Sequence, residues 1–365
     1  MVASDGKDLG QSGLDIDLGN ACSRTAYGWA KRSFQNRWNK LGMPCLGQEG
    51  GFSNLMDYGD LRIAMSSDGI GTKVELAERT GIYDTLGFDL VAMTCDDLVA
   101  NGIEPVNLSN ILDVDRLDHR VVDLLMKGLH DAAKHANIAV VGGEIAELGD
   151  RIGGWGTGMH FNWCATAVGV LPKGREPIDG KAIQPGHAVV SLRSRGFRSN
   201  GFSLIRKIMQ KQHGPQWHKA MADERRSWGE VLLSPSLVYS PLVVGLVREG
   251  CPLHGVVHVT GGGLADNLGR VLAGNGLGAH LDEIHEPQAF VRALQTLGDV
   301  PEEQAYRLWN MGNGMLLVMP PTDVEAACKF AARKGYMARP CGRITDTRHI
   351  VIETRGCHPT ELVYE

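Results

Sequence analysis

The chain has 365 residues, a net charge of −5, 43% hydrophobic residues and 22% charged residues. This balance is typical of a globular protein with a sizeable core, and the length suggests two domains of ordinary size or one large one. The negative charge excludes a basic field for non-specific nucleic-acid binding, and no apolar run is long enough to span a bilayer. We therefore expect neither nucleic acid nor a membrane as a partner.

In chain order, the first half alternates predicted strands and helices. Residues 60–68 alternate in polarity as a strand does, and the helix predicted at 84–102 is closed by Asn101-Gly102. Further strands are predicted at 104–114, 138–144 and 161–171, and a second amphipathic helix at 116–137. This order favours an α/β or α+β domain over residues 1–175.

The second half begins in a polar stretch rich in proline and glycine, residues 172–186, and we expect a second α/β domain over 176–365. A Trp-rich charged insertion covers about 212–230. Strands are predicted at 187–192, 255–259, 314–320 and near the C-terminus, and helices at 202–212, 237–250, 264–274 and 323–335.

Glycine and cysteine usage narrow the class further. The 47 glycines cluster between apolar runs, as in "VVGGE" and "TGGG", which indicates backbone that approaches a ligand. The eight cysteines never form a C-x-x-C pair, and the N-terminal segment is polar, unlike a signal peptide. These features predict reduced thiols and a cytoplasmic location, with neither a disulfide framework nor a zinc site.

The segment "SSDGIGTK", 66–73, has the glycines and lysine of a phosphate-binding loop but fails the P-loop spacing. Asp68 ends a predicted strand, Asp97 lies in a predicted helix, and Glu144 ends another strand. Carboxylates at strand ends gather where α/β sheets bind ligands, and hard oxygen ligands suit Mg²⁺ together with phosphate oxygens. Magnesium would let an aspartate face a phosphate, with Lys73 adding positive charge. A tight turn at Asp68 and a surface Glu144 are the alternative, which the residues alone leave open.

Two further segments place polar residues and glycines before predicted helices. "HVTGGGLADNL", 258–268, offers free backbone N–H groups and a helix dipole to an anion, although an unliganded helix cap explains it equally well. Ser199 and Asn200 precede another helix, where capping alone would explain Ser199. His258 adjoins the glycine cluster and is the histidine of most interest.

Together these motifs resemble the phosphoribosylformylglycinamidine cyclo-ligase family, also called aminoimidazole ribonucleotide synthetase. Over about 14–345 the order and rough spacing of the motifs match: "DIDLGN", "SSDGIGTK", "GFDLVAMTCDDLVANGIEP", "VVGGEIAE", "RSNGFSLIRKI", "LSPSLVY", "HVTGGGLADNLGRVL" and "WNMGNGMLLV". The resemblance implies a two-domain α/β (α+β) synthetase fold, in which the N-terminal sheets of two subunits join into a dimer barrel. It implies a homodimer with ATP bound near the subunit boundary.

The implied reaction belongs to purine biosynthesis. Formylglycinamidine ribonucleotide and ATP give aminoimidazole ribonucleotide, ADP and phosphate through an iminophosphate, with ATP and Mg²⁺ as cofactors. The resemblance assigns roles as follows: Asp68, Asp97 and Glu144 to the metal; Asp68, Lys73, Asp97 and His258 to catalysis; Gly50, Gly51, Gly69, Gly71, Thr72 and Lys73 to the nucleotide; Arg198, Ser199, Asn200, Thr260, Gly261, Gly262 and Gly263 to the substrate.

The chain departs from the family pattern around this site. Arg198 replaces the usual His before "SNG", and because Arg stays protonated it cannot replace a His that transfers protons, though it could bind phosphate. Asp96 replaces the usual Asn, Ile145 replaces a Thr, and "AELGDRIGGWGTG" replaces a shorter loop. These changes suggest a divergent branch of the enzyme or a paralogue that cyclises or phosphorylates a related ribonucleotide.

Other classes fit less well. A selenophosphate synthetase needs a reactive Cys near an N-terminal glycine loop, which only Cys45 approximates. A hydrogenase-maturation dehydratase ends in cysteine, whereas Cys357 is internal, and a thiamine-phosphate kinase lacks the "SNG" and "TGGG" combination. A non-catalytic nucleotide-binding subunit is favoured mainly by Arg198, and the intact carboxylates argue against it.

Overall fold

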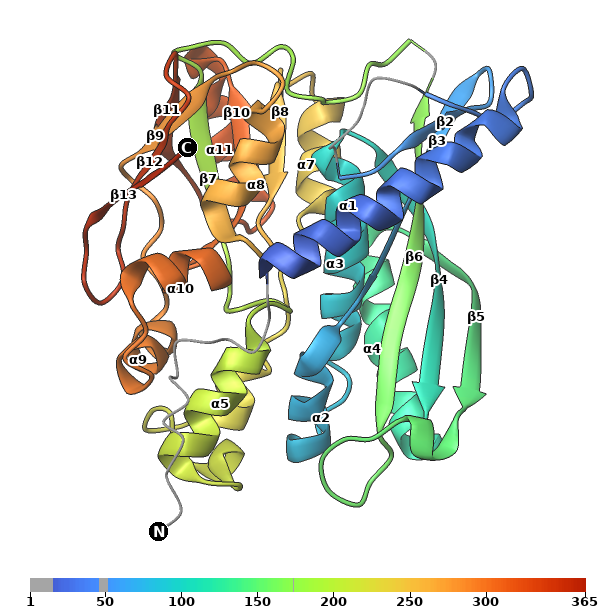
Figure 1. Ribbon diagram of the computed structural model, residues 1–365, viewed down its shortest axis with the longest axis vertical. Coiled ribbons are helices and arrows are strands. Elements are labelled where there is room, and N and C mark those ends of the chain that lie inside the picture. Colours follow the sequence, from blue (N-terminus) through green and yellow to red (C-terminus); the bar gives the residue numbers. More distant parts are fainter. Residues whose placement is uncertain (1–15, 46–51, 173) are drawn as a thin grey trace.

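The computed structural model describes residues 16–45, 52–172 and 174–365, and it arranges them as two sheet-containing halves that lie side by side (Figure 1). The first sheet has six strands in the order β1-β2-β3-β6-β4-β5, and the second has seven in the order β13-β12-β9-β11-β7-β10-β8. The mixed α/β class and the two sheet-containing domains are confirmed. The predicted boundary at 175/176 falls between the two sheets and stays a prediction.

The N-terminal half contains these elements: α1 (Ile16–Arg32), η1 (Ser33–Arg37), β1 (Met43–Pro44), β2 (Leu55–Asp57), β3 (Leu61–Gly69), η2 (Gly71–Lys73), α2 (Val74–Thr80), α3 (Leu86–Ala100), β4 (Glu104–Val114), α4 (His119–Ala136), β5 (Ala139–Glu147), η3 (Gly149–Arg151) and β6 (Phe161–Pro172).

The C-terminal half contains these: β7 (Ala188–Arg193), α5 (Phe202–His213), η4 (Trp217–Lys219), α6 (Trp228–Leu232), α7 (Ser240–Arg248), β8 (Gly255–His258), α8 (Gly263–Leu272), β9 (Gly278–Leu281), α9 (Ala289–Leu297), α10 (Glu302–Leu308), β10 (Asn313–Met319), η5 (Pro321–Asp323), α11 (Val324–Arg333), β11 (Ala338–Thr345), β12 (Ile350–Glu353) and β13 (Glu361–Tyr364).

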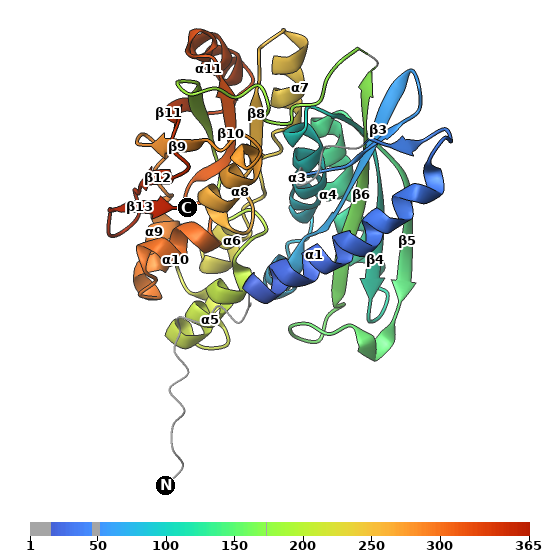
Figure 2. The ribbon, with the colours of Figure 1, turned by 45° about the horizontal axis from the view of Figure 1, so that its top comes forward.

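The first sheet is covered by helices on one face and open on the other. Side chains alternate along β3, so that Ala64 and Ser66 are buried while Met65 is 61% exposed. On β4, Ile111 is 47% exposed on the same open face as Met65. Figure 2 shows α3 and α4 on the side of this sheet that faces the C-terminal half. The polarity pattern of β3 therefore directs Ser66 and Asp68 toward these helices.

Helix α3 joins the two halves. It packs on α4, β3 and β6 within the N-terminal half, and on α7 and β8 of the C-terminal half. The crossing with α4 is close, because a Cβ on Gly87 would lie 2.3 Å from the backbone carbon of Gly128. Almost every residue of α3 is buried, including the charged Asp89 and Asp96. Buried carboxylates need partners. Those of Asp96 come from the C-terminal half, whereas Asp89 is paired with Lys73 of the N-terminal half and with Ser236 of the C-terminal half.

The longer predicted elements are confirmed within a few residues at their ends. The alternating segment at 60–68 is β3, and the segment predicted as a strand at 104–114 is β4. The sequence analysis predicted one strand near the C-terminus, where the structure has β11, β12 and β13. It missed β9, α9 and α10, and also the short β1, β2, α2 and α6. Gly50 and Gly51 lie outside the described residues. In the part of the chain that the structure describes, no helix is both long and apolar enough to cross a bilayer.

Candidate active site

Three of the predicted residues, Asp68, Asp97 and His258, come together from β3, α3 and β8. The ring Nδ1 of His258 lies 2.7 Å from Oδ1 of Asp97, and the hydroxyl of Ser66 donates to Oδ2 of Asp97 at 3.2 Å. Asp68 accepts the backbone N–H of Gly69 at 2.7 Å. Burial raises the pKa of the Asp68 carboxyl and the nearby charge of Asp97 raises it further, while the Gly69 N–H opposes both. The result is a pair of acidic groups next to a fully buried histidine.

Two positions that depart from the family pattern contact each other behind this cluster. The Arg198 guanidinium donates to Oδ2 of Asp96 at 2.7 Å and lies 3.0 Å from Nε2 of His258. The other oxygen of Asp96 accepts the backbone N–H groups of Tyr239 and Ser240 at 2.9 Å each, at the start of α7. The extra negative charge expected at Asp96 is therefore balanced by Arg198. Arg198 itself is 2% exposed, so its guanidinium is buried and pairs with Asp96 inside the protein.

Lys73 forms a second buried ion pair. Its amine lies 2.8 Å from both carboxylate oxygens of Asp89, and it donates to the carbonyl of Ser234 at 2.8 Å. Asp89 also accepts the backbone N–H and the hydroxyl of Ser236. Since both charged side chains are 0% exposed, the amine of Lys73 is turned into the protein, not toward an open nucleotide loop. The neighbouring Thr72 is exposed.

Glu144 does not join the other carboxylates within one chain. It lies on β5 opposite Ile111, which pairs with Cys164 of β6, which in turn pairs with Gly69. Three strand spacings separate Glu144 from Gly69, or about 14 Å. Residues directly opposite each other point to the same face, so Glu144 points to the open face of the sheet, with Ile111, and Asp68 to the helix-covered face.

The predicted cluster of three metal-binding carboxylates is therefore not assembled in a single chain. Among the described residues, no group of three or more His, Cys, Asp or Glu side chains could hold a metal ion. Asp68 and Asp97 still provide two hard oxygen groups close together. That donor set fits Mg²⁺ in its usual arrangement with nucleotides, in which one or two carboxylates share the ion with phosphate oxygens and water.

The predicted substrate segments meet in one large cavity. Asn200, Gly261 and Gly262 line a groove of about 1090 Å³, together with Arg270 and Arg348. Gly262 has a φ of +90° and directly precedes α8. These five residues place a glycine-rich helix start and two cations around one open space, which the acidic Asp266 and Glu365 also line.

The turn at the start of α8 needs glycine and a hidden asparagine. A Cβ on Gly263 would lie 1.7 Å from the carbonyl oxygen of Tyr306, so no other residue fits there. Asn267, fully buried, donates to the carbonyls of Gly261 and Gly263 and accepts the hydroxyl of Thr260. The sequence reasoning missed Asn267, although a polar residue on the apolar side of an amphipathic helix is a usable signal.

Ser199, whose buried hydroxyl has no partner among the described residues, precedes Asn200.

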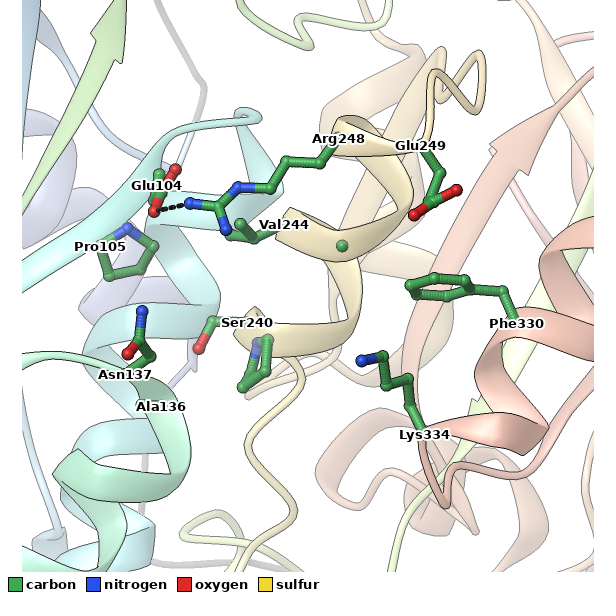
Figure 3. A pocket seen from close by; sticks show the side chains of 12 residues that line it. Glu104, Pro105, Ala136, Asn137, Ser240, Val244, Arg248, Glu249, Phe330 and Lys334 are labelled. Carbon is green, nitrogen blue, oxygen red and sulfur yellow. Dashed lines mark hydrogen bonds and ion pairs between the residues drawn. The ribbon is translucent and has the colours of Figure 1, made fainter.

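A second cavity, of about 280 Å³, lies in the seam between the halves (Figure 3). Arg248 of α7 reaches across it to Glu104 of β4, at 2.5 Å. Lys334 and Asn137, both exposed, are among the other residues that line it. None of the predicted site residues lines this seam pocket, so the candidate active site lies elsewhere.

Comparisons with known proteins place this geometry in a class. Residues 53–171 match the N-terminal domain of AIR synthase related protein, and residues 184–355 match its C-terminal domain. The chain is thus a two-domain protein of the AIR-synthase-related class.

Relatives narrow the class to one family. Phosphoribosylformylglycinamidine cyclo-ligase of Thermococcus kodakarensis is 36% identical over 95% of this chain and 98% of its own. The protein of that name from Magnetococcus marinus is 35% identical over 92% and 93%, and the chloroplastic/mitochondrial one of Vigna unguiculata 35% over 91% and 79%. The chain belongs to the phosphoribosylformylglycinamidine cyclo-ligase family.

Solved structures support the fold. Hydrogenase maturation protein HypE in complex with ATP has a TM-score of 0.58 at 18% identity, covering 82% of this chain and 84% of that one. PurL of Thermotoga maritima complexed with FGAR has a TM-score of 0.57 at 16% identity, covering 87% and 48%. At these identities the likeness concerns the two-domain fold alone.

Proposed function

We propose that this chain catalyses the ATP-dependent closure of formylglycinamidine ribonucleotide to aminoimidazole ribonucleotide in purine biosynthesis. The relatives that it matches along nearly its whole length are named for this cyclo-ligase activity. The observation that carries the proposal is that the acidic pair Asp68 and Asp97 is joined to the glycine turn by His258, which ends β8 only two residues before Thr260. A phosphoryl donor and an anionic substrate can thus be held next to each other.

The chemistry requires an oxygen to become a leaving group. Transfer of the ATP γ-phosphoryl to the formamide oxygen forms a P–O bond, releases ADP and gives an iminophosphate. The amidine nitrogen then attacks the activated carbon, a C–N bond closes the five-membered ring, and the C–O bond breaks to release phosphate with the former amide oxygen. The amide nitrogen loses its proton when the iminophosphate forms, and the amidine nitrogen loses one when the ring closes. Such a sequence asks the protein mainly for positioning, charge stabilisation and exclusion of water.

Asp68 and Asp97 are the residues that would hold Mg²⁺. When bound, the ion would neutralise charge on the phosphates of ATP. The helix-facing side of β3 directs Asp68 into the site, and the Gly69 N–H and Ser66 hydroxyl fix the two carboxylates. Because the two carboxylates repel the phosphates of a nucleotide, they can face ATP only if a cation lies between the carboxylates and the phosphates.

The groove at α8 is the proposed site of the ribonucleotide phosphate. The backbone N–H groups at the start of α8 and the positive end of its dipole favour an anion there. Arg270 and Arg348 line the same groove and add positive charge, and Asn200 offers a polar contact from the opposite segment. The hydrogen bonds of Thr260 and Asn267 stabilise the conformation of this turn.

The proposed active form is a homodimer that joins the open faces of two first sheets. Met65 and Ile111 leave apolar area exposed on that face, which supports burial against a second copy. Glu144 lies on the same face and would then lie at the subunit boundary, where the resemblance puts the ATP site. The cytoplasmic location also stays a proposal, and it agrees with the eight cysteines, which are all unpaired.

The deciding experiment combines purified protein, formylglycinamidine ribonucleotide and Mg-ATP, with colorimetric detection of the aminoimidazole and Asp68→Asn as the matched control. We expect product with the natural protein and almost none with the variant. No product, alongside normal ATP binding, would reject this function. It would favour the second candidate, a paralogue acting on a related ribonucleotide, for which the replacements Arg198 and Ile145 are the specific observations.

A further inference from the structure

We infer that Arg198 and Asp96 form one coupled positioning unit, which holds the His258 ring in a single orientation and through it fixes the carboxylate of Asp97. The unit goes beyond charge balance, because the same guanidinium nitrogen serves both the carboxylate and the imidazole. The inference rests on the proposed function only where it treats Asp97 as a residue that faces the metal ion. The contacts themselves require no ligand.

Arg198 has an unusual backbone conformation and is held by several contacts. It has a φ of +60°, a left-handed conformation that is uncommon for a residue with a side chain, and it is 2% exposed. Such a conformation persists where surrounding contacts hold it. Here the guanidinium contacts Asp96 at 2.7 Å, His258 at 3.0 Å and the carbonyl of Leu237 at 3.3 Å, and it lies 5.0 Å from the centre of the Tyr239 ring.

The hydrogen-bond donors around His258 determine which of its ring nitrogens carries the hydrogen. A guanidinium has only donors, so Nε2 of His258 must be the acceptor at 3.0 Å and carries no hydrogen. The hydrogen of the neutral ring is then on Nδ1, which donates to Oδ1 of Asp97 at 2.7 Å. Both ring nitrogens are engaged and the side chain is 0% exposed. His258 is therefore assigned as a positioning residue, in place of the catalytic role expected from the sequence.

Asp97 is the last residue in this series of contacts, and both of its carboxylate oxygens accept hydrogen bonds. Asp97 accepts His258 on one oxygen and Ser66 on the other, and its side chain is still 20% exposed. Two donors on opposite oxygens fix the plane of the carboxylate, which leaves its remaining lone pairs at the edge of the site, beside Asp68. Arg198 thus acts on Asp97 through His258, from inside the protein.

The test is a double-mutant cycle read by thermal unfolding and by ¹⁵N NMR of histidine-labelled protein, with His258→Gln to assign the ring signals. Arg198→Met leaves Asp96 buried without its cation and should lower the melting temperature by roughly 5 °C. The double variant Asp96→Asn/Arg198→Met removes both charges and should recover at least half of that loss. In the double variant the Nε2 resonance of His258 should still move from its natural position, because its donor is gone.

Three results would overturn the inference. They are a hydrogen on Nε2 of His258 in the natural protein, an Nε2 resonance that stays in place in the double variant, and a stability loss in the double variant equal to the sum of the losses in Asp96→Asn and Arg198→Met. A role in charge balance alone predicts the second result. If Arg198→Met does not fold, Asp96→Asn/Arg198→Met still reports on the resonance. No substrate is needed, so failure to form the aminoimidazole product would reject the proposed function and leave this inference standing.

Discussion

Replacing Lys73 by Met separates two explanations of the glycine-lysine motif. In the structure the Lys73 amine pairs with Asp89 at 2.8 Å, and both side chains are 0% exposed. Methionine keeps the volume but leaves the Asp89 carboxylate buried without its cation, which costs about 3–5 kcal/mol. For a chain of this length that loss corresponds to a melting temperature lower by about 4–6 °C. ATP affinity should change little, because the amine faces the interior.

Differential scanning fluorimetry and isothermal titration with Mg-ATP measure the two effects. Lys127→Met is the matched control, since Lys127 is 56% exposed and its surface ion pair with Asp84 is screened by solvent, so its loss should change the melting temperature little. The double variant Lys73→Met/Asp89→Asn should regain much of the lost stability. A Lys73→Met protein that melts like the natural one but binds ATP at least tenfold more weakly would refute the reasoning and restore Lys73 to the nucleotide loop.

Three further predictions concern Asp68, Glu78 and the open sheet face. Asp68→Asn should reduce turnover at least 100-fold without lowering the melting temperature, because burial raises the pKa of that carboxyl and the fold tolerates an uncharged group; initial rates near normal would remove Asp68 from the site. Burial raises the pKa of Glu78 from 4.5 to about 7, so its contribution to stability is complete below pH 4.5 and is lost as the pH rises through 7. The Glu78→Gln variant should therefore have the same melting temperature as the natural protein at pH 4.5. At pH 8 its melting temperature should be higher by roughly 1–2 °C, after allowance for the partial exposure of the side chain. A difference in melting temperature that stays constant with pH would contradict this. Finally, light scattering at micromolar concentration should show a dimer that Ile111→Asp converts to monomers; a monomeric natural protein would contradict the shared-sheet assembly.

The sequence predicted what depends on local periodicity. The alternation that ends at Asp68 and the apolar stretch that contains Asp97 were long enough to identify β3 and α3. The four-residue strands β9, β12 and β13 show no usable period, because two or three alternations do not separate a strand from a loop.

The partners of charged residues could not be predicted in the same way. Lys73 pairs with a residue 16 positions away and with a carbonyl 161 positions away, so the sequence alone made it look like a phosphate ligand. Arg198 and Asp96 are 102 positions apart, and the two departures were not recognised as one compensated change.

The face on which a strand residue points is equally hard to predict. The register between β4 and β5 shifts between Leu108 and Ser109, and a shift of one residue moves a side chain to the opposite face. Glu144 lies beyond that irregularity. Its place on the open face, away from Asp68, therefore depends on the register of β4 and β5. The expectation that carboxylates at strand ends gather at one site takes no account of that register.

In the proposed reaction, the protein transfers a phosphoryl group to the amide oxygen of its substrate. Formylglycinamidine ribonucleotide carrying ¹⁸O in its formyl group tests this directly, with ³¹P NMR or mass spectrometry of the inorganic phosphate released. The proposed reaction predicts one ¹⁸O atom in each phosphate, which should form at the same rate as aminoimidazole ribonucleotide. Unlabelled phosphate, with the ¹⁸O recovered in water or retained in the ribonucleotide, would contradict it.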